Sequence, residues 1–108
     1  MDADGVIRVM TDYDCFPLWR RGDGGTTNAD PATLPISAGL AAELPAWADD
    51  YDDTLDRDDP VSSGFADPAG EEAFNARGRE LARRLAGELG RAVGYYDPAT
   101  ARDVSIRP

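Results

Sequence analysis

The chain has 108 residues, a formal net charge of −10 and a sequence pI near 4.2. It contains no histidine and no lysine, the usual base and amine nucleophile near neutral pH, so its composition argues against most kinds of enzyme, and no cofactor is expected. Its charge repels phosphate backbones and anionic membrane surfaces, so we expect no direct nucleic-acid binding, no membrane binding and a basic protein as the partner.

The first expected element is a short strand at Val6 to Met10, where valine and isoleucine suit a pleated surface. From Thr11 to Pro35 three glycines and three prolines interrupt the chain, so a long loop is expected there. Loops of this length in small domains are usually functional or disordered, and the aromatic residues in this one argue against disorder. The aromatic and apolar cluster consists of Tyr13, Phe16, Leu18 and Trp19.

Two interpretations of this cluster stay open. The side chains can pin the loop over a sheet and fill the edge of the core. Alternatively, Tyr13, Phe16 and Trp19 can belong to a partner-binding patch, because aromatic residues are enriched at interface hot spots.

A helix is expected to begin after Ser37, whose hydroxyl suits an N-cap. Its apolar residues recur at spacings of three and four, which places them on one stripe: Leu40, Leu44, Trp47, Tyr51 and Leu55. The other side is acidic and carries Glu43, Asp49, Asp50, Asp52, Asp53 and Asp56. Pro45 removes one backbone donor, so a kink or a split at this position stays open.

The acidic side of this helix is the most informative feature of the sequence, because seven aspartates fall within the eleven residues 49–59. Pairs four apart, such as Asp49 with Asp53, repel by roughly 0.2–0.5 kcal/mol each, and the helix dipole adds a penalty at this end. A cationic partner relieves that repulsion, so the acidic face is interpreted as a receptor for arginine or lysine. A merely solvated surface is the simpler alternative. The residues predicted to bind the partner are Asp49, Asp50, Asp52, Asp53, Asp56, Trp19, Phe16 and Tyr13.

Residues 57–66 are interpreted as a connector, and Asp67 followed by Pro68 predicts the start of a second helix that runs to about Leu89. The apolar stripe of this helix repeats the spacing of the first, and Gly90 supplies a C-terminal stop. The stripe consists of Phe74, Gly78, Leu81, Leu85 and Leu89.

Residues 92–97 and 103–107 predict two strands around a turn at Asp97-Pro98. The elements together predict an α+β fold in the order strand, loop, helix, helix, strand, strand. Two helices are expected to pack on one face of a small antiparallel or mixed sheet of two to three strands. The length suits a single globular domain over residues 1–108.

Cys15 is the single cysteine, so no internal disulfide can form, and no N-terminal segment suggests export. A reduced, cytoplasmic protein is therefore expected. Asp12 and Asp14 should raise the pKa of Cys15, which makes a reactive thiol the weaker alternative to an incidental cysteine.

The segment from Arg8 to Trp19 (RVM-x-DY-x-C-x-PLW) resembles the opening segment of short acidic proteins from GC-rich, actinobacterial-type genomes. Residues 46–52 (AWADDYD) and 76–82 (ARGRELA) are similar to the helices of that group. The resemblance implies an actinobacterial-type source and a single domain, and it transfers no activity and no site residue. In size, charge and lack of catalytic groups the chain is also similar in general style to toxin-neutralising immunity proteins.

The leading hypothesis is a non-enzymatic acidic binding module, most concretely an immunity or antitoxin-like inhibitor of a basic protein. A second hypothesis is a nucleic-acid mimic whose carboxylates occupy the DNA groove of a DNA-binding protein. A third is a small carboxylate-dependent enzyme or divalent-cation-binding protein, although residues 49–60 lack the central glycine of a calcium loop and end in proline. The sequence leaves the oligomeric state open.

Overall fold

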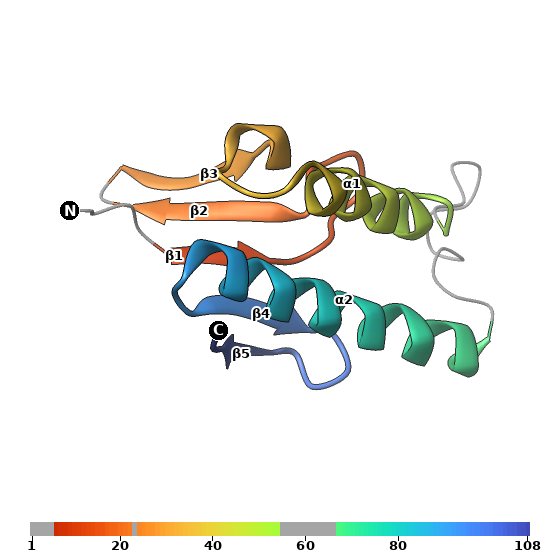
Figure 1. Cartoon of the computed structure of the whole chain (residues 1–108). Helices are drawn as coiled ribbons and strands as arrows, with labels where there is room; N and C mark the ends of the chain where they lie inside the picture. The colour runs from red at the N-terminus through yellow and green to blue at the C-terminus, as the bar shows by residue number, and fades with distance from the viewer. Residues whose placement is uncertain (1–5, 23, 55–66) are drawn as a thin grey trace.

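Over the described residues, 6–22, 24–54 and 67–108, five strands form one mixed sheet and two long helices cover one of its faces in this computed structural model (Figure 1). The strands are β1 (Val6–Val9), β2 (Leu18–Gly22), β3 (Gly25–Ala29), β4 (Val93–Asp97) and β5 (Arg102–Ile106). They lie in the order β3-β2-β1-β4-β5. The central pair β1 and β4 is parallel, and the other neighbours are antiparallel.

The prediction of two to three strands is wrong, although the α+β class agrees with the structure. Strands β2 and β3 lie inside residues 11–35, which the glycines and prolines predict to be a loop. Three of these glycines and prolines instead lie at the boundaries of the strands. Pro17 directly precedes β2, and Gly22 at the end of β2 pairs with Gly25 at the start of β3 across a two-residue connection. Gly25 has a φ of 109°, a conformation that favours glycine.

Helix α1 (Ala38–Asp52) begins as expected, because Oγ of Ser37 accepts a hydrogen bond from the Leu40 amide at 3.2 Å. Pro45 lies inside α1 without dividing it. Leu40, Leu44 and Trp47 are buried, as their spacing predicts. Leu55, the last residue of the predicted stripe, lies outside the described residues.

Helix α2 (Pro68–Leu89) confirms the predicted capping. The side chain of Asp67 accepts from the Ala69 amide at 2.9 Å, and Gly90 ends the helix in the left-handed conformation with a φ of 70°. A short 3₁₀ helix, η1 (Pro31–Thr33), precedes α1. The predicted connector at 57–66 lies outside the described residues.

The core fills the space between the helices and the inner face of the sheet. The central strands β1 and β4 contribute Ile7, Val9, Val93 and Tyr95, and all four are at most 1% exposed. The two C-terminal strands agree with the prediction to within one or two residues. Because β1 and β4 are parallel, their carboxyl ends meet at one edge of the sheet, and the segments that follow them are brought together there.

Candidate functional site

The acidic end of α1 is formed by four of the predicted partner-binding residues, Asp49, Asp50, Asp52 and Asp53. Asp52 is half-buried and the other three are exposed. The last turn of α1 contains no basic residue. Within the described ranges, the side chains of the three exposed aspartates make no ion pair and no hydrogen bond. Their charges therefore face solvent at a helix end whose dipole is also negative.

Asp56, the fifth predicted aspartate, lies outside the described residues.

The segment 10–17, between β1 and β2, folds against this end of α1. The amide of Asp14 donates to Oδ1 of Asp52 at 3.0 Å. The ring of Tyr13 stacks on that of Tyr51 with 4.6 Å between centroids. Tyr13 therefore anchors the segment and also lies beside the acidic end of α1.

The structure separates the two remaining aromatic residues of the predicted site. Phe16 is 42% exposed and lines a surface depression together with Asp49 and Asp52. Trp19 lies in β2, where it pairs with Arg8 of β1, on the sheet face that points away from the helices. Trp19 is thus not brought together with the acidic end of α1, whereas Phe16 is.

Glu43, which the periodicity places on the acidic side of α1, links the two helices. Its carboxylate lies 2.7 Å from Nη1 of Arg84 and 3.8 Å from Nη2 of Arg77. The hydrogen bond to Glu43 raises the pKa of Arg84 above its usual value. Glu43 is therefore already occupied by cations of the chain itself.

Carboxylates of segment 10–17 and of α1 form one negative region. Burial first, and then the charges of Asp12, Asp14 and Asp52, raise the pKa of Cys15, as Asp12 and Asp14 predict from the sequence. Burial, a neighbouring hydroxyl and the charges of Asp12 and Asp52 raise the pKa of Tyr51 to about 12. The pKa values of Cys15, in segment 10–17, and of Tyr51, in α1, are thus both raised by Asp12 and Asp52.

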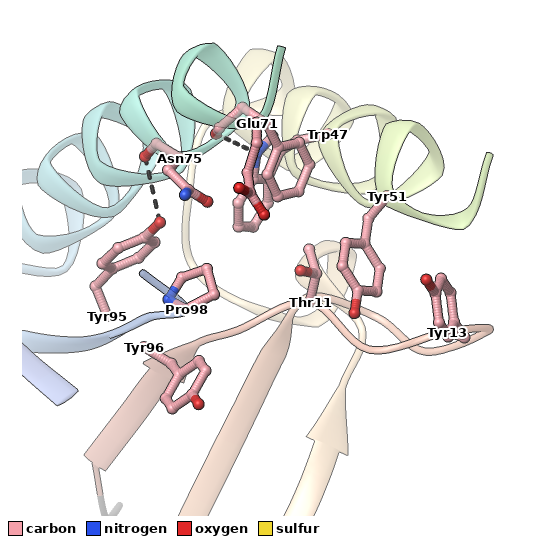
Figure 2. A pocket seen from close by; sticks show the side chains of 10 residues that line it. Thr11, Tyr13, Trp47, Tyr51, Glu71, Asn75, Tyr95, Tyr96 and Pro98 are labelled. Carbon is pink, nitrogen blue, oxygen red and sulfur yellow. Dashed lines mark hydrogen bonds between the residues drawn. The ribbon is translucent and has the colours of Figure 1, made fainter. Parts of the chain in front are cut away.

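A pocket of about 260 Å³ opens beside this region, at the carboxyl ends of β1 and β4 (Figure 2). We call it the aromatic pocket, because a row of rings runs along it from Tyr13 through Tyr51 and Phe74 to Trp47. The centroids of Tyr51 and Phe74 are 5.9 Å apart, and those of Phe74 and Trp47 are 4.8 Å apart. Tyr95, at the end of β4, also lines it.

Buried hydrogen bonds hold the inner wall of the aromatic pocket in place. Nε1 of Trp47 donates to the carbonyl oxygen of Phe74 at 3.0 Å. The hydroxyl of Tyr95 donates to the carbonyl oxygen of Asn75 at 3.2 Å, and burial raises the pKa of this hydroxyl to about 12. The wall is therefore preorganised, because neither side chain can leave its position without breaking a buried hydrogen bond.

Two polar side chains from the first turns of α2 point into the aromatic pocket (Figure 2). One is the carboxylate of Glu71, which the positive end of the α2 dipole stabilises. The other is the carboxamide of Asn75, a residue that is only 7% exposed. In the described part of the chain neither side chain has a hydrogen-bond or ion-pair partner. Because no buried side-chain nitrogen or oxygen atom of the described residues lacks a hydrogen bond, the unpaired amide atoms of Asn75 reach the open space of the pocket, where an external group can bind them.

A comparison with protein-family models matches residues 5–98 to the family described as Serratia CdiI immunity protein-like. The chain belongs to this CdiI-like family. Among curated proteins, the sequence comparison finds no match. Membership makes the chain an immunity protein of the contact-dependent inhibition type, whose partner is a protein toxin. The predicted immunity-like role is confirmed at this level.

The aromatic pocket of this CdiI-like protein escaped the sequence analysis, apart from Tyr13. Its polar residues, Glu71 and Asn75, belong to no motif that the sequence predicts as a site. The apolar stripe does not mark Asn75, because it lies about 100° around the helix from Phe74, but the structure leaves it only 7% exposed. A polar residue on a buried helix face calls for a partner.

Among the residues that the structure describes, no three side chains of cysteine, aspartate or glutamate are placed to hold a metal ion. Within the same ranges, no helix is both long enough and apolar enough to cross a membrane.

Proposed function

We propose that this CdiI-like immunity protein neutralises its toxin, without catalysis and in the cytoplasm, by binding a basic surface of the toxin. The contact surface is the acidic end of α1 together with Phe16. The observation that carries the proposal is the set of exposed carboxylates at a helix end that has no basic residue in its last turn. Asp56 extends the same acidic sequence.

The carboxylates of this surface should affect both the affinity for the toxin and the rate of association with it. Spaced like charges at the C-terminal end of a helix destabilise the free protein slightly, and cations of a partner remove that penalty on binding. A negative region on a chain with a net charge of −10 also raises the rate of encounter with a basic protein, in a way that salt weakens. Phe16, which borders Asp49 and Asp52, adds an exposed apolar contact beside the charges.

The test begins with the purified chain as bait in a lysate of its source cells at low and at high salt, with mass spectrometry of the retained proteins. A retained toxin domain is then purified, and its association rate constant is measured against salt concentration. Asp49→Asn and Asp53→Asn, singly and together, are the informative variants. Both side chains lack intramolecular partners in the described residues, and removing like charges should stabilise α1, so unfolding cannot explain a loss of binding.

Glu80→Gln is the matched control, because it removes one exposed charge from the middle of α2. We expect the double variant to lower the association rate constant several-fold at low salt and to have little effect at high salt. Glu80→Gln should change the rate far less. Equal effects of the two changes, or an association rate that does not depend on salt, would contradict the proposed surface.

A further inference from the structure

We propose that the aromatic pocket receives one arginine side chain of the toxin. This inference deepens the proposed function and rests on it, because the toxin supplies the arginine. It also names a contact separate from the acidic end of α1. In this arrangement the acidic end brings the two proteins together, and the pocket holds them.

The polar groups of the pocket match a guanidinium. Glu71 is the one charged residue among the described residues that line the pocket, and its carboxylate can accept two parallel N–H bonds. Asn75 offers a carboxamide oxygen nearby, and both side chains are otherwise unpaired within the described ranges. A guanidinium has five N–H donors and no acceptor, so it can satisfy both groups at once. An anionic ligand would be repelled by Glu71.

The rings of the pocket also match a flat cation. Tyr51 is half-buried, so a guanidinium in the pocket can contact its ring with a cation–π attraction, whereas Trp47 and Phe74 stack on each other and form the wall behind it at 1% and 8% exposure. The position of the Trp47 ring is fixed before binding, because its indole N–H is hydrogen-bonded to the backbone carbonyl of Phe74. A preorganised wall lowers the entropic cost of binding a single side chain.

The volume of the aromatic pocket suits a single side chain. A volume of about 260 Å³ lies below the roughly 300–1,000 Å³ of pockets that hold drug-sized ligands, and it suits one long side chain. Asp12 and Asp52 raise the pKa of Tyr51 at the rim, so a cation enters a negative region as it approaches. Lysine is the poorer fit, because an ammonium is compact, strongly hydrated and unable to stack as a plane.

The pocket can be tested without the toxin by NMR titration with Nα-acetyl-arginine amide. The reporters are the side-chain amide signals of Asn75 and the indole N–H signal of Trp47. We expect saturable shifts with a dissociation constant in the millimolar range, as befits a single side chain. Nα-acetyl-citrulline amide, which has the same shape without the charge, should cause no saturable shift. The lysine analogue should bind more weakly than the arginine analogue.

Glu71→Gln and Glu72→Gln form a matched pair of variants. Both glutamates are exposed and adjacent near the N-terminal end of α2, so each change removes one exposed negative charge from the same place, but Glu72 does not line the aromatic pocket. Glu71→Gln should weaken binding of the arginine analogue about tenfold or more, as expected for the loss of a charge-assisted hydrogen bond. Glu72→Gln should leave it within about twofold.

The same pair of variants tests the complex with the toxin. Glu71→Gln should raise the dissociation rate constant about tenfold at low and at high salt, whereas Glu72→Gln should not. Equal shifts with arginine and citrulline analogues, or equal effects of the two variants, overturn the pocket assignment even if Asp49→Asn slows association. Failure to find any toxin complex overturns the proposed function itself, and with it the assignment of the arginine to a toxin.

Discussion

Gly78→Ala tests how closely α2 packs against α1. A Cβ atom at Gly78 would press on Cζ2 of Trp47 and lie 3.0 Å from both Cη2 of Trp47 and Cε1 of Tyr95. Alanine in place of glycine stabilises a helix interior by about 1 kcal/mol. Overpacking a tight core costs about 1–3 kcal/mol. Trp47 cannot move away cheaply, because its indole N–H is bonded to the carbonyl of Phe74.

The cost of the clash should therefore exceed the helix gain, and we expect the free energy of unfolding to fall by up to about 2 kcal/mol. The assay is urea unfolding at equilibrium, followed by circular dichroism. Gly70→Ala and Gly87→Ala are the controls, because both glycines lie in α2 and a Cβ atom added at either position would meet no atom within 4 Å. These two changes should stabilise the protein by about 0.5–1 kcal/mol. A stabilising effect of Gly78→Ala equal to that of the controls would refute the packing argument.

Three ionisable groups, Tyr95, Glu88 and Cys15, should show pH-dependent behaviour that can be measured. Because burial raises the pKa of Tyr95 from 10.0 to about 12, the stability that its protonated hydroxyl contributes is complete below pH 10 and is lost between pH 10 and 12, by at most about 3 kcal/mol; Tyr95→Phe should remove this part of the alkaline loss in unfolding curves. Hydrogen bonds from Ser37 lower the pKa of Glu88 in the folded protein. Ionised Glu88 therefore stabilises the fold above the pKa that it has in the unfolded chain, and this stabilisation is lost as the pH falls through its lower pKa in the folded protein. Glu88→Gln should make the free energy of unfolding depend less on pH in acid. Burial and neighbouring carboxylates raise the pKa of Cys15, so its alkylation near pH 8 should be slower than that of a model thiol, and Asp52→Asn should speed it.

Local signals predicted the helices and the C-terminal strands well. Ser37, Asp67 and Gly90 act through hydrogen bonds or dihedral angles within a few residues, and such signals can be recognised in a sequence. Strands β2 and β3 were not predicted, because the local signal for them in the sequence is weak. Most of their residues are exposed arginines, threonines and glycines on both faces, so the alternation of apolar and polar residues is weak. The Asp-Gly pair at 23–24 was the available hairpin signal.

The candidate site was predictable only in part, because it is assembled from distant segments. The aspartates of α1 are contiguous, so the sequence could reveal their charge. The aromatic pocket combines residues after β1, on α1, on α2 and at the end of β4. Their proximity follows from the parallel pairing of β1 with β4, which no local pattern encodes. Trp19 shows the same limit, since the alternation of side chains along β2 turns it to the other face of the sheet.

That parallel pairing also bears on how the protein folds. Arg8 pairs with Gly94, so the centre of the sheet joins segments from near the two ends of the chain. During synthesis, β1, β2 and β3 can form a meander early, but one edge of β1 stays unpaired until β4 has been made. Contacts between such distant residues slow folding, and an open apolar edge invites association with other chains in the meantime. Protection against a toxin should therefore lag behind translation, and changes that weaken the pairing at Gly94 should reduce the yield of folded protein.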